Sequence, residues 1–417
     1  MVKETIHIAC NIDTSYVKYC IVMLTSLFEN NQNVSFHIHV ITEDLSNECR
    51  SQMVEFVENK YHQRVEFYYV DMDLVKDCPR YAEGSHISLA AYYRIFLGNL
   101  LPLKIHKVLY LDCDLVVVGS IEKLWNTDLK TFAVACVEDM WSGREEIYTR
   151  LHYPSSDSYF NSGVLLVNLD YWREEGLMSK ALDYISKNGS KLVFYDQDVL
   201  NALLHDCKLF LPFRYNVQDG FLRRKRRIRP ESIAALDQEL LHPVIIHYTG
   251  GKKPWQYKSQ HPYKGLYFHY LDLTPWKGER PVVPFSYKLK RVFDQLLYFM
   301  RLARPKYRKC IELFAGAGGL ALGLEQAGFE EVALIEIDKT ACETLKLNRP
   351  KWNVLNEDIV EVSKRDLLKE FNLKEGELDL ISGGYPCQSF SYAGKKLGLD
   401  DVRGTMFYYY AEFIKQL

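Results

Sequence analysis

Short apolar stretches rich in β-branched residues alternate with amphipathic stretches along the first 280 residues. Strand-like runs cover residues 5–10, 35–41 and 64–70, and helical periodicity covers 17–30 and 47–60. Strands that alternate with helices are typical of a parallel α/β sheet, whose ligands bind beyond the carboxyl ends of the strands. The pattern therefore predicts an α/β domain with its site at that edge of the sheet.

The longest apolar run, residues 107–119, reads as one buried strand that carries two acids. Asp112 and Asp114 lie inside it with one residue between them. Residues two apart in a strand point to the same face, so both carboxylates can converge where the strand ends. Neighbouring buried carboxylates are costly unless a cation neutralises them, which indicates a divalent metal that can also bind a diphosphate. A solvated strand end, or a turn capped by acids, is the alternative.

Three further polar segments adjoin apolar elements. Asn161 introduces an apolar strand over residues 159–168, and an Asp-Gln-Asp cluster at 196–198 begins a helix, where carboxylates suit the helix dipole. A strand ending at His247 runs into a glycine-bearing turn at 249–255. Glycine lets a backbone approach phosphate groups, and the lysines of this turn supply positive charge.

In this order, these segments resemble the glycosyltransferases of family 8. The resemblance covers residues 5–280 and implies a GT-A fold with a mixed, mainly parallel sheet. It also implies a retaining hexosyltransferase that moves galactose or glucose from a UDP-sugar to a glycan acceptor such as lipooligosaccharide, with a manganese ion. The motifs are Leu-Asp-Cys-Asp at 111–114, Phe-Asn-Ser-Gly-Val at 160–164, Asp-Gln-Asp at 196–198 and His-Tyr-Thr-Gly-Gly-Lys-Lys-Pro-Trp at 247–255.

The same resemblance assigns a role to individual positions. Asp112, Asp114 and His247 match the metal ligands, and an imidazole beside two carboxylates fits Mn²⁺ better than Mg²⁺. Glu138 competes with Asp139 for one sugar-facing position. The positions that match contacts to the nucleotide and diphosphate are Ala9, Asp13, Tyr16, Gly250 and Lys253, and those facing the donor sugar are Arg94, Asp139, Asn161, Asp196 and Gln197.

The chemistry expected from these assignments centres on the leaving group. The metal and Lys253 neutralise the charge that develops on UDP as the glycosidic bond breaks. Retention of configuration needs either a covalent intermediate or attack from the face of the leaving group. Gln197 occupies the family's nucleophile position, and an amide is a poor nucleophile. We therefore expect same-face attack by the acceptor, with Gln197 and Asp196 positioning the donor.

The overall composition is that of a globular protein and points to no particular partner. Hydrophobic residues make up 47% of the chain and charged residues 25%, with a net charge of -2. The ten cysteines show no Cys-x-x-Cys spacing, which favours reduced thiols. No signal peptide is evident, and no apolar run reaches the roughly eighteen residues that span a bilayer. We therefore expect a cytoplasmic protein.

Positive charge is concentrated in two segments. The run at residues 223–229 is compatible with a solvated loop, with a nuclear signal or nucleic-acid patch, or with a surface facing an acceptor or lipid. Residues 281–309 combine many lysines and arginines with apolar residues at helical spacing. Such a basic amphipathic helix lies on an anionic membrane surface or packs on its own domain. The first alternative predicts a peripheral position on the inner face of a bacterial membrane.

A different pattern follows the basic helix. A short strand enters a glycine turn at 314–319 and continues as a helix, so a ligand could contact backbone at the helix N-terminus. Glu336, at the end of the next strand, suits ribose hydroxyls. Asp358 ends another strand, and Cys387 follows a proline in a loop of small residues.

This series resembles the DNA cytosine-5 methyltransferases, which have a Rossmann-like fold and use S-adenosylmethionine. Cys387 matches the thiolate that attacks C6 of a flipped-out cytosine and activates C5 for methylation. The positions that match cofactor contacts are Phe314, Gly316, Gly318, Glu336 and Asp358.

The sequence stops at Leu417, before the family's Glu-Asn-Val motif and its target-recognition domain. We therefore expect a GT-A domain over 1–280, a basic linker over 281–309, and an incomplete methyltransferase domain over 310–417. On this interpretation the last segment binds S-adenosylmethionine weakly at most and does not methylate DNA by itself. The alternative is half of a DNA (cytosine-5) methyltransferase that needs a second chain for activity.

Overall fold

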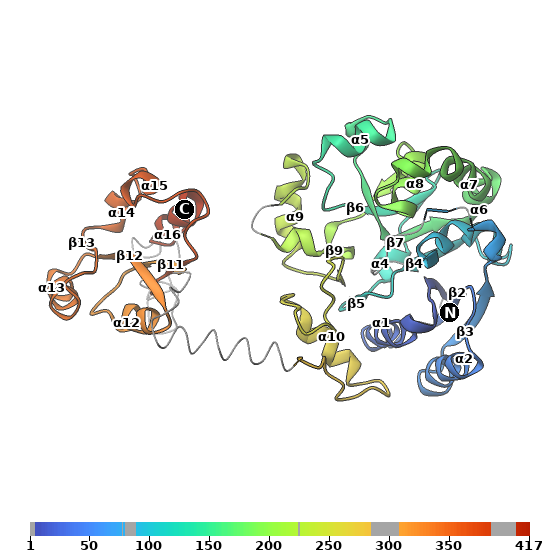
Figure 1. Ribbon diagram of the computed structural model, residues 1–417, viewed down its shortest axis with the longest axis horizontal. Coiled ribbons are helices and arrows are strands. Elements are labelled where there is room, and N and C mark those ends of the chain that lie inside the picture. Colours follow the sequence, from blue (N-terminus) through green and yellow to red (C-terminus); the bar gives the residue numbers. More distant parts are fainter. Residues whose placement is uncertain (1–4, 77, 80–88, 224–225, 285–307, 385–405) are drawn as a thin grey trace. The chain divides into compact units, whose positions relative to one another are not determined.

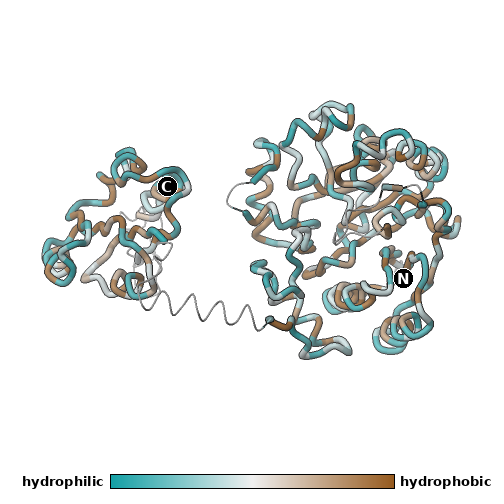
Figure 2. Tube along the Cα trace, viewed as in Figure 1, coloured by the Kyte–Doolittle hydropathy of each residue, from teal (hydrophilic) through white to brown (hydrophobic). Residues whose placement is uncertain are grey.

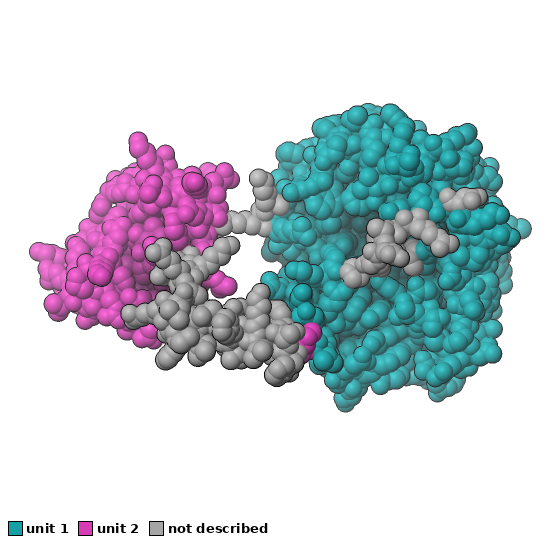
Figure 3. Space-filling model, viewed as in Figure 1, with its two compact units in different colours: residues 1–282 teal, residues 283–417 magenta. Residues whose placement is uncertain are grey.

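The computed structural model divides into two compact units, residues 1–282 and 283–417, each with its own sheet and apolar core (Figures 1 and 3). Within the described residues, no helix combines the length and apolar character needed to cross a bilayer. The residues that the structure describes are 5–76, 78–79, 89–223, 226–284, 308–384 and 406–417.

A seven-stranded sheet with the order β3-β2-β1-β4-β7-β6-β8 forms the centre of the N-terminal unit. The first four strands are parallel, β7 is antiparallel to both its neighbours, and β8 is parallel to β6. This mixed, mainly parallel sheet confirms the predicted fold class. The strands are β1 (Ile6–Asn11), β2 (Phe36–Thr42), β3 (Arg64–Tyr69), β4 (Lys107–Leu111), β6 (Val134–Glu138), β7 (Phe160–Asn168) and β8 (Lys208–Phe210).

Each face of this sheet is covered by its own apolar core, and hydrophobic segments gather in the interior of the unit (Figure 2). Side chains alternate between the two cores along β1, where Ile8 and Cys10 face one and Ala9 faces the other. The helices are α1 (Val17–Glu29), α2 (Asn47–Val54), α3 (Leu97–Leu100), α4 (Glu122–Trp125), α5 (Glu145–Leu151), α6 (Leu169–Glu174), α7 (Leu177–Asn188), α8 (Tyr195–Leu204), α9 (Ile233–Glu239) and α10 (Lys264–Leu271).

The apolar run at 107–119 is two strands, and the prediction of one continuous strand is wrong. β4 ends at Leu111, and β5 (Leu115–Val117) belongs to a separate three-stranded sheet with β10 (Ile245–His247) and β9 (Val217–Gln218). Two carboxylates need polar partners that the apolar interior of a strand does not offer. The chain therefore leaves the first sheet at Asp-Cys-Asp, and the ends of both sheets meet there.

The C-terminal unit contains a four-stranded, wholly parallel sheet with the order β13-β12-β11-β14. Its small parallel α/β architecture agrees with the predicted Rossmann-like class. Its elements are β11 (Arg308–Leu313), α12 (Gly319–Gln326), β12 (Phe329–Glu336), α13 (Lys339–Asn348), β13 (Val354–Asn356), α14 (Ile359–Val362), α15 (Leu367–Glu370), β14 (Leu380–Ser382) and α16 (Met406–Gln416).

Two predictions concern residues that lie outside the described ranges. Most of the basic segment 281–309, and with it the amphipathic membrane helix, falls in the gap between 284 and 308. Cys387 falls in the gap between 384 and 406. The linker and the thiol nucleophile therefore stay predictions, as do the domain limits that depend on them.

Candidate active site

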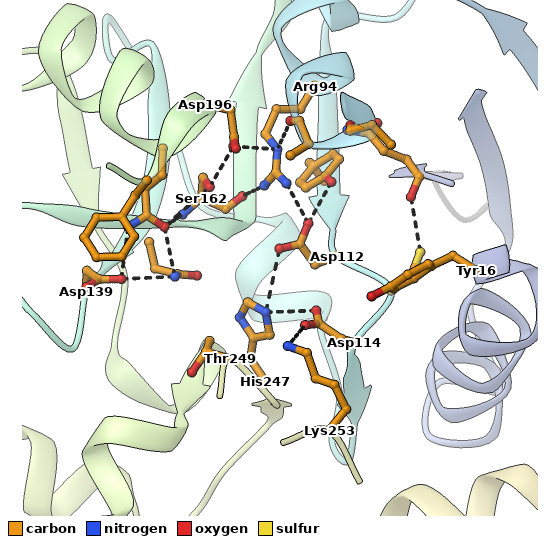
Figure 4. A pocket seen from close by; sticks show the side chains of 18 of the residues that line it. Tyr16, Arg94, Asp112, Asp114, Asp139, Ser162, Asp196, His247, Thr249 and Lys253 are labelled. Atoms are coloured by element: carbon orange, nitrogen blue, oxygen red, sulfur yellow. Dashed lines mark hydrogen bonds and ion pairs between the residues drawn. The ribbon is translucent and has the colours of Figure 1, made fainter. Parts of the chain in front are cut away.

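A cavity of about 470 Å³ opens at the carboxyl ends of β1 and β4 in the N-terminal unit (Figure 4). The end of β6, the start of the antiparallel β7, the first turn of α8 and the end of β10 complete its wall. This is the edge at which the pattern of strands and helices predicts ligand binding. The predicted site residues that line it are Asp13, Tyr16, Arg94, Asp112, Asp114, Asp139, Asn161, Asp196, Gln197, His247 and Lys253.

The three predicted metal ligands lie together in the cavity. His247 Nε2 is 3.1 Å from Asp114 Oδ1 and 3.7 Å from Asp112 Oδ2. One candidate ligand atom from each residue lies within 4.8 Å of the others. Two carboxylate oxygens and one imidazole nitrogen at this spacing are a suitable donor set for a divalent transition ion.

A polar contact behind His247 favours the metal-binding form of its ring. Asn216 donates its amide hydrogen to Asn161 Oδ1 at 2.8 Å, so its own Oδ1 faces His247 Nδ1 at 3.0 Å and accepts from it. With its proton on Nδ1, His247 would present the lone pair of Nε2 to a metal ion between it and Asp114, which is the usual arrangement behind a metal-bound histidine. No sequence motif marks Asn216, which lies 31 residues before its partner.

Gly163 gives the predicted metal ligands the space that they occupy. A Cβ atom at this position would lie 2.2 Å from His247 Cε1 and 2.6 Å from Asp112 Oδ2. The Gly163 carbonyl also accepts a hydrogen bond from the Asp112 amide at 2.9 Å. Glycine is therefore the residue that allows Asp112 and His247 to approach each other, a role that the sequence motif alone does not indicate.

Lys253 pairs directly with Asp114, one of the predicted metal ligands. Its Nζ donates to Asp114 Oδ2 at 2.5 Å and to the Tyr248 carbonyl at 2.6 Å. Burial by itself would raise the pKa of Asp114, but the charge of Lys253 and the contacts with His247 and Lys253 hold that pKa well below its usual value. Asp114 is therefore an anion at neutral pH, as a metal ligand must be.

Arg94, on the 3₁₀ helix η4 (Leu89–Phe96), connects the predicted metal ligands to the opposite side of the cavity. Its buried guanidinium contacts Asp112 Oδ1 at 2.9 Å and Asp196 Oδ2 at 3.1 Å, and donates to the Ser162 carbonyl. Burial raises the pKa of Asp196 to about 6, although the charge of Arg94 opposes this shift.

A hydrogen-bonded amide network forms the wall beyond Arg94. Asp139 Oδ2 accepts from Asn161 Nδ2 at 3.1 Å and from Gln197 Nε2 at 3.2 Å, while Gln197 Oε1 accepts from the Ser162 amide at 3.0 Å. Both ends of the Gln197 amide are therefore engaged, and its orientation is fixed. Burial raises the pKa of Asp139 to about 6.

The structure separates the two adjacent acids at the end of β6. Asp139 lines the cavity, whereas Glu138 points away and accepts from Ser142 Oγ at 2.6 Å and Ser232 Oγ at 2.7 Å. Arg229, from the basic run, contacts the same Glu138 carboxylate at 3.2 Å. Asp139 is therefore the acid available to a ligand, and Arg229 has a structural partner within its own unit.

Two predicted contact residues lie behind the wall of the cavity. Ala9 is fully buried in β1, two residues before the first lining residue, Asn11. A Cβ at Gly250 would lie 2.1 Å from Asp219 Oδ2, so Gly250 packs against that carboxylate while Gly251 lines the cavity. Lining residues outside the quoted sequence motifs include Ile12, Ala90, Ala91, Met140, Trp141 and Val193.

The glycine turn of the C-terminal unit lies beside Glu336, and the predicted cofactor contacts of both stay predictions. Gly316 N donates to Glu336 Oε2 at 2.8 Å, and Gly318 adopts a φ of 88°, which favours glycine. Phe314, also predicted to contact the cofactor, is the first residue of the turn and has a φ of 57°. The Asp358 carboxylate accepts from the Val360 amide as the N-cap of α14, so its predicted cofactor contact stays a prediction.

Comparison with protein families gives two separate matches along the chain. The model described as "Glycosyl transferase family 8" matches residues 7–259, and the model "C-5 cytosine-specific DNA methylase" matches residues 308–417. General stress protein A of Bacillus subtilis is 32% identical over 280 residues, covering 66% of this chain and 95% of that protein. Lipopolysaccharide 1,2-glucosyltransferase of Escherichia coli K12 is 29% identical over 320 residues, which cover 74% of this chain and 93% of that protein.

The C-terminal match is closer in sequence but shorter. The Type II methyltransferase M.PspPI of Psychrobacter sp. is 56% identical over 107 residues, which cover 26% of this chain and 24% of that protein. The chain thus spans about a quarter of this relative. Among solved structures, galactosyltransferase LgtC with donor and acceptor sugar analogs matches with a TM-score of 0.60 and 23% identity, covering 68% of this chain and 100% of that one. This likeness shows a shared fold.

Proposed function

Because the chain belongs to glycosyl transferase family 8 and carries a segment of the cytosine-specific DNA methylase family, we propose that its N-terminal unit transfers a hexose from a UDP-sugar to a glycan. The observation that carries this proposal is the cluster of Asp112, Asp114 and His247 beside Lys253 in one cavity. Galactose or glucose is the proposed sugar, and the names of a glucosyltransferase and a galactosyltransferase among the relatives support that choice.

Mn²⁺ is the proposed metal, and the residues present fit it. Asp114 is anionic, His247 presents Nε2, and Asp112 completes a mixed oxygen and nitrogen set. When bound, the ion supplies positive charge that stabilises the departing diphosphate. Lys253, now paired with Asp114, would donate hydrogen bonds to the same diphosphate.

The donor sugar is proposed to lie against the amide network. Asn161, Gln197 and Asp139 offer fixed donors and acceptors in a buried wall, which orient sugar hydroxyls without reorganisation. The engaged, neutral amide of Gln197 supports a positioning role over a nucleophilic one. We therefore propose retention through attack by the acceptor on the face that the UDP leaves, with Arg94 holding Asp196 in place.

The uridine end is proposed to lie beside the loop after β1, where Asp13 and Tyr16 line the cavity. Asp13 already accepts from the Ser15 amide at 2.9 Å, which fixes its carboxylate at the start of a 3₁₀ turn. Ala9 and Gly250 would then shape the cavity from behind. A lipooligosaccharide-like acceptor on the inner face of a membrane completes the proposal.

UDP release by the purified full chain tests this function. We expect release that requires Mn²⁺ and differs between UDP-galactose and UDP-glucose. Product anomers analysed by NMR should have the configuration of the donor. Absence of release with either donor, at saturating Mn²⁺ and with a panel of glycan acceptors, would overturn the assignment.

For the C-terminal segment, we propose binding of S-adenosylmethionine at the glycine turn beside Glu336. Calorimetric titration of the cofactor into the full chain tests this proposal. A heat of binding that disappears in Glu336→Ala supports it, and no heat in the wild type overturns it. DNA modification together with a second chain stays a prediction.

A further inference from the structure

Three histidines gather on one face of the N-terminal sheet, away from the cavity. His7 of β1 is the register partner of His37 in β2, and His39 follows two residues later on the same strand. Register partners in parallel strands, and residues two apart in one strand, share a face. All three precede the carboxyl ends of their strands, where the cavity lies. His39 is fully buried and His37 is 7% exposed.

The ring nitrogens converge on a small space. His7 Nδ1 lies 2.9 Å from His39 Nε2, and one nitrogen from each of the three rings lies within 4.8 Å of the others. Ligand nitrogens around a tetrahedral ion are roughly 3.3 Å apart, given metal–nitrogen bonds of about 2.0–2.1 Å. Small side-chain shifts therefore suffice to place an ion among the rings.

Neighbouring side chains on β3 set the protonation of His39. The Tyr68 hydroxyl donates its proton to Glu66 Oε2 at 2.7 Å, so its oxygen accepts from His39 Nδ1 at 3.1 Å. With its proton on Nδ1, His39 presents the lone pair of Nε2 to the centre of the cluster. A carboxylate acting through a hydrogen bond on the far nitrogen is the usual support of a metal-bound imidazole.

A buried nitrogen of His37 that lacks a hydrogen-bond partner within the described ranges is a second indication that an ion binds among the three rings. Its Nε2 is buried and has no hydrogen-bond partner among the described residues; the carboxylate of Glu66 lies 3.5 Å away. A buried polar atom without a partner costs free energy, and such atoms in native structures are usually satisfied by a group that binds there. Glu66 places a carboxylate oxygen beside the cluster, although its other oxygen pairs with Arg64.

We propose that His7, His37 and His39 form a second metal site, suited to Zn²⁺ or a similar imidazole-preferring ion. Three neutral imidazoles and one nearby carboxylate are a donor set that zinc binds and that Mg²⁺ and Ca²⁺ avoid. On binding, His7 moves its proton from Nδ1 to Nε2, so no net proton is released at that ring. The site joins β1 to β2 and involves none of the residues proposed for sugar transfer.

Cobalt(II) titration of the metal-free full chain tests the site, because tetrahedral Co²⁺ has intense visible absorption bands. We expect these bands in the wild type and equally in Asp114→Asn, which removes a ligand from the cavity. In His37→Gln the affinity for Co²⁺ should fall at least about tenfold. His106→Gln is the matched control, since the His106 side chain is 71% exposed and lies outside the cluster.

A second variant keeps all three ligands and guards against misfolding of His37→Gln. Tyr68→Phe removes only the hydroxyl behind His39, and it should weaken Co²⁺ binding about tenfold while circular dichroism stays unchanged. Absence of visible bands in the wild type, or bands unchanged in both variants, would overturn the proposal. So would near-ultraviolet thiolate-to-cobalt bands, which would place the ion at the buried cysteines Cys10, Cys20 and Cys113.

Discussion

The cavity of the N-terminal unit and the glycine turn of the C-terminal unit obtain their polar groups over very different sequence distances. Lys253 contacts Asp114 across 139 residues, whereas Gly316 contacts Glu336 across 20. The first site exists only when two sheets and several loops are assembled, and charged groups such as Asp114 and Asp139 have partners far along the chain. The second is made by one strand-turn-helix-strand segment. A change in the first should therefore spread through its network, and a change in the second should stay local.

The largest effect is expected from Asp114→Asn. Loss of this carboxylate removes a metal ligand and leaves Lys253 without its anionic partner, so Mn²⁺-dependent UDP release should fall on the order of a hundredfold to a thousandfold. Steady-state rates over a range of Mn²⁺ concentrations measure the change. Binding of S-adenosylmethionine, measured on the same protein, should be unaffected; a parallel loss would contradict the comparison.

Gly163→Ala should be the next most severe change. The added methyl group forces His247 and Asp112 apart, and displacement of a reacting group by about 1 Å can cost about a hundredfold in rate. Gly265→Ala, in α10, is the control, because its Cβ would meet nothing within 4 Å. Rates for both variants, with thermal unfolding to check the fold, test this prediction. Equal rates would show that the cavity tolerates the shift.

Acidification should reduce UDP release with a midpoint near pH 6. Burial raises the pKa of Asp139 to about 6 and that of Asp196 to about 6, so both lose their negative charge below that value. The rate should fall about tenfold per pH unit below the midpoint if one ionised acid is required. In Asp139→Asn, the part of the pH dependence of UDP release that comes from Asp139 should disappear.

The contribution of these groups to the free energy of unfolding should change with pH in the direction opposite to their effect on the rate of UDP release. The folded-state pKa of Asp139 lies above its ordinary value of 3.8, so the folded protein binds this proton more tightly than the unfolded chain. Its contribution to the free energy of unfolding therefore falls as pH rises from 3.8 to about 6. Unfolding curves of wild type and Asp139→Asn across this range give the difference, and a rising contribution would contradict the burial argument.

The smallest effect on sugar transfer is expected from Gly318→Ala. A Cβ here would lie 2.3 Å from Leu345 Cδ2, at a φ of 88° that disfavours alanine by about 1 kcal/mol or more. Binding of S-adenosylmethionine should weaken about tenfold, while UDP release stays within twofold of wild type. A clear loss of UDP release would show that the two sites depend on each other.

The positions of the polar segments follow from the sequence, because acids and amides at the ends of apolar strands must share one edge of a parallel sheet. The choice between Glu138 and Asp139 does not, since a register irregularity between Cys136 and Val137 re-aims the end of β6. Asn216 has no local signal, as its role depends on a contact formed only in the folded chain. The end of β4 before Asp112 can be seen in the sequence, because polar residues interrupt the apolar run. The sequence does not show that the residues after Asp114 join another sheet.

Arg94 has a consequence for how the side chains of this cavity can evolve. Its single guanidinium contacts Asp112, a proposed metal ligand, and Asp196, a proposed sugar contact, so the two are not independently replaceable. Loss of Asp196 would leave the buried guanidinium of Arg94 with one of its two carboxylate partners and would draw it toward Asp112. If Asp196 contacts the donor sugar as proposed, we expect a lineage that replaces it to alter Arg94 as well, so that a change of sugar would take two substitutions.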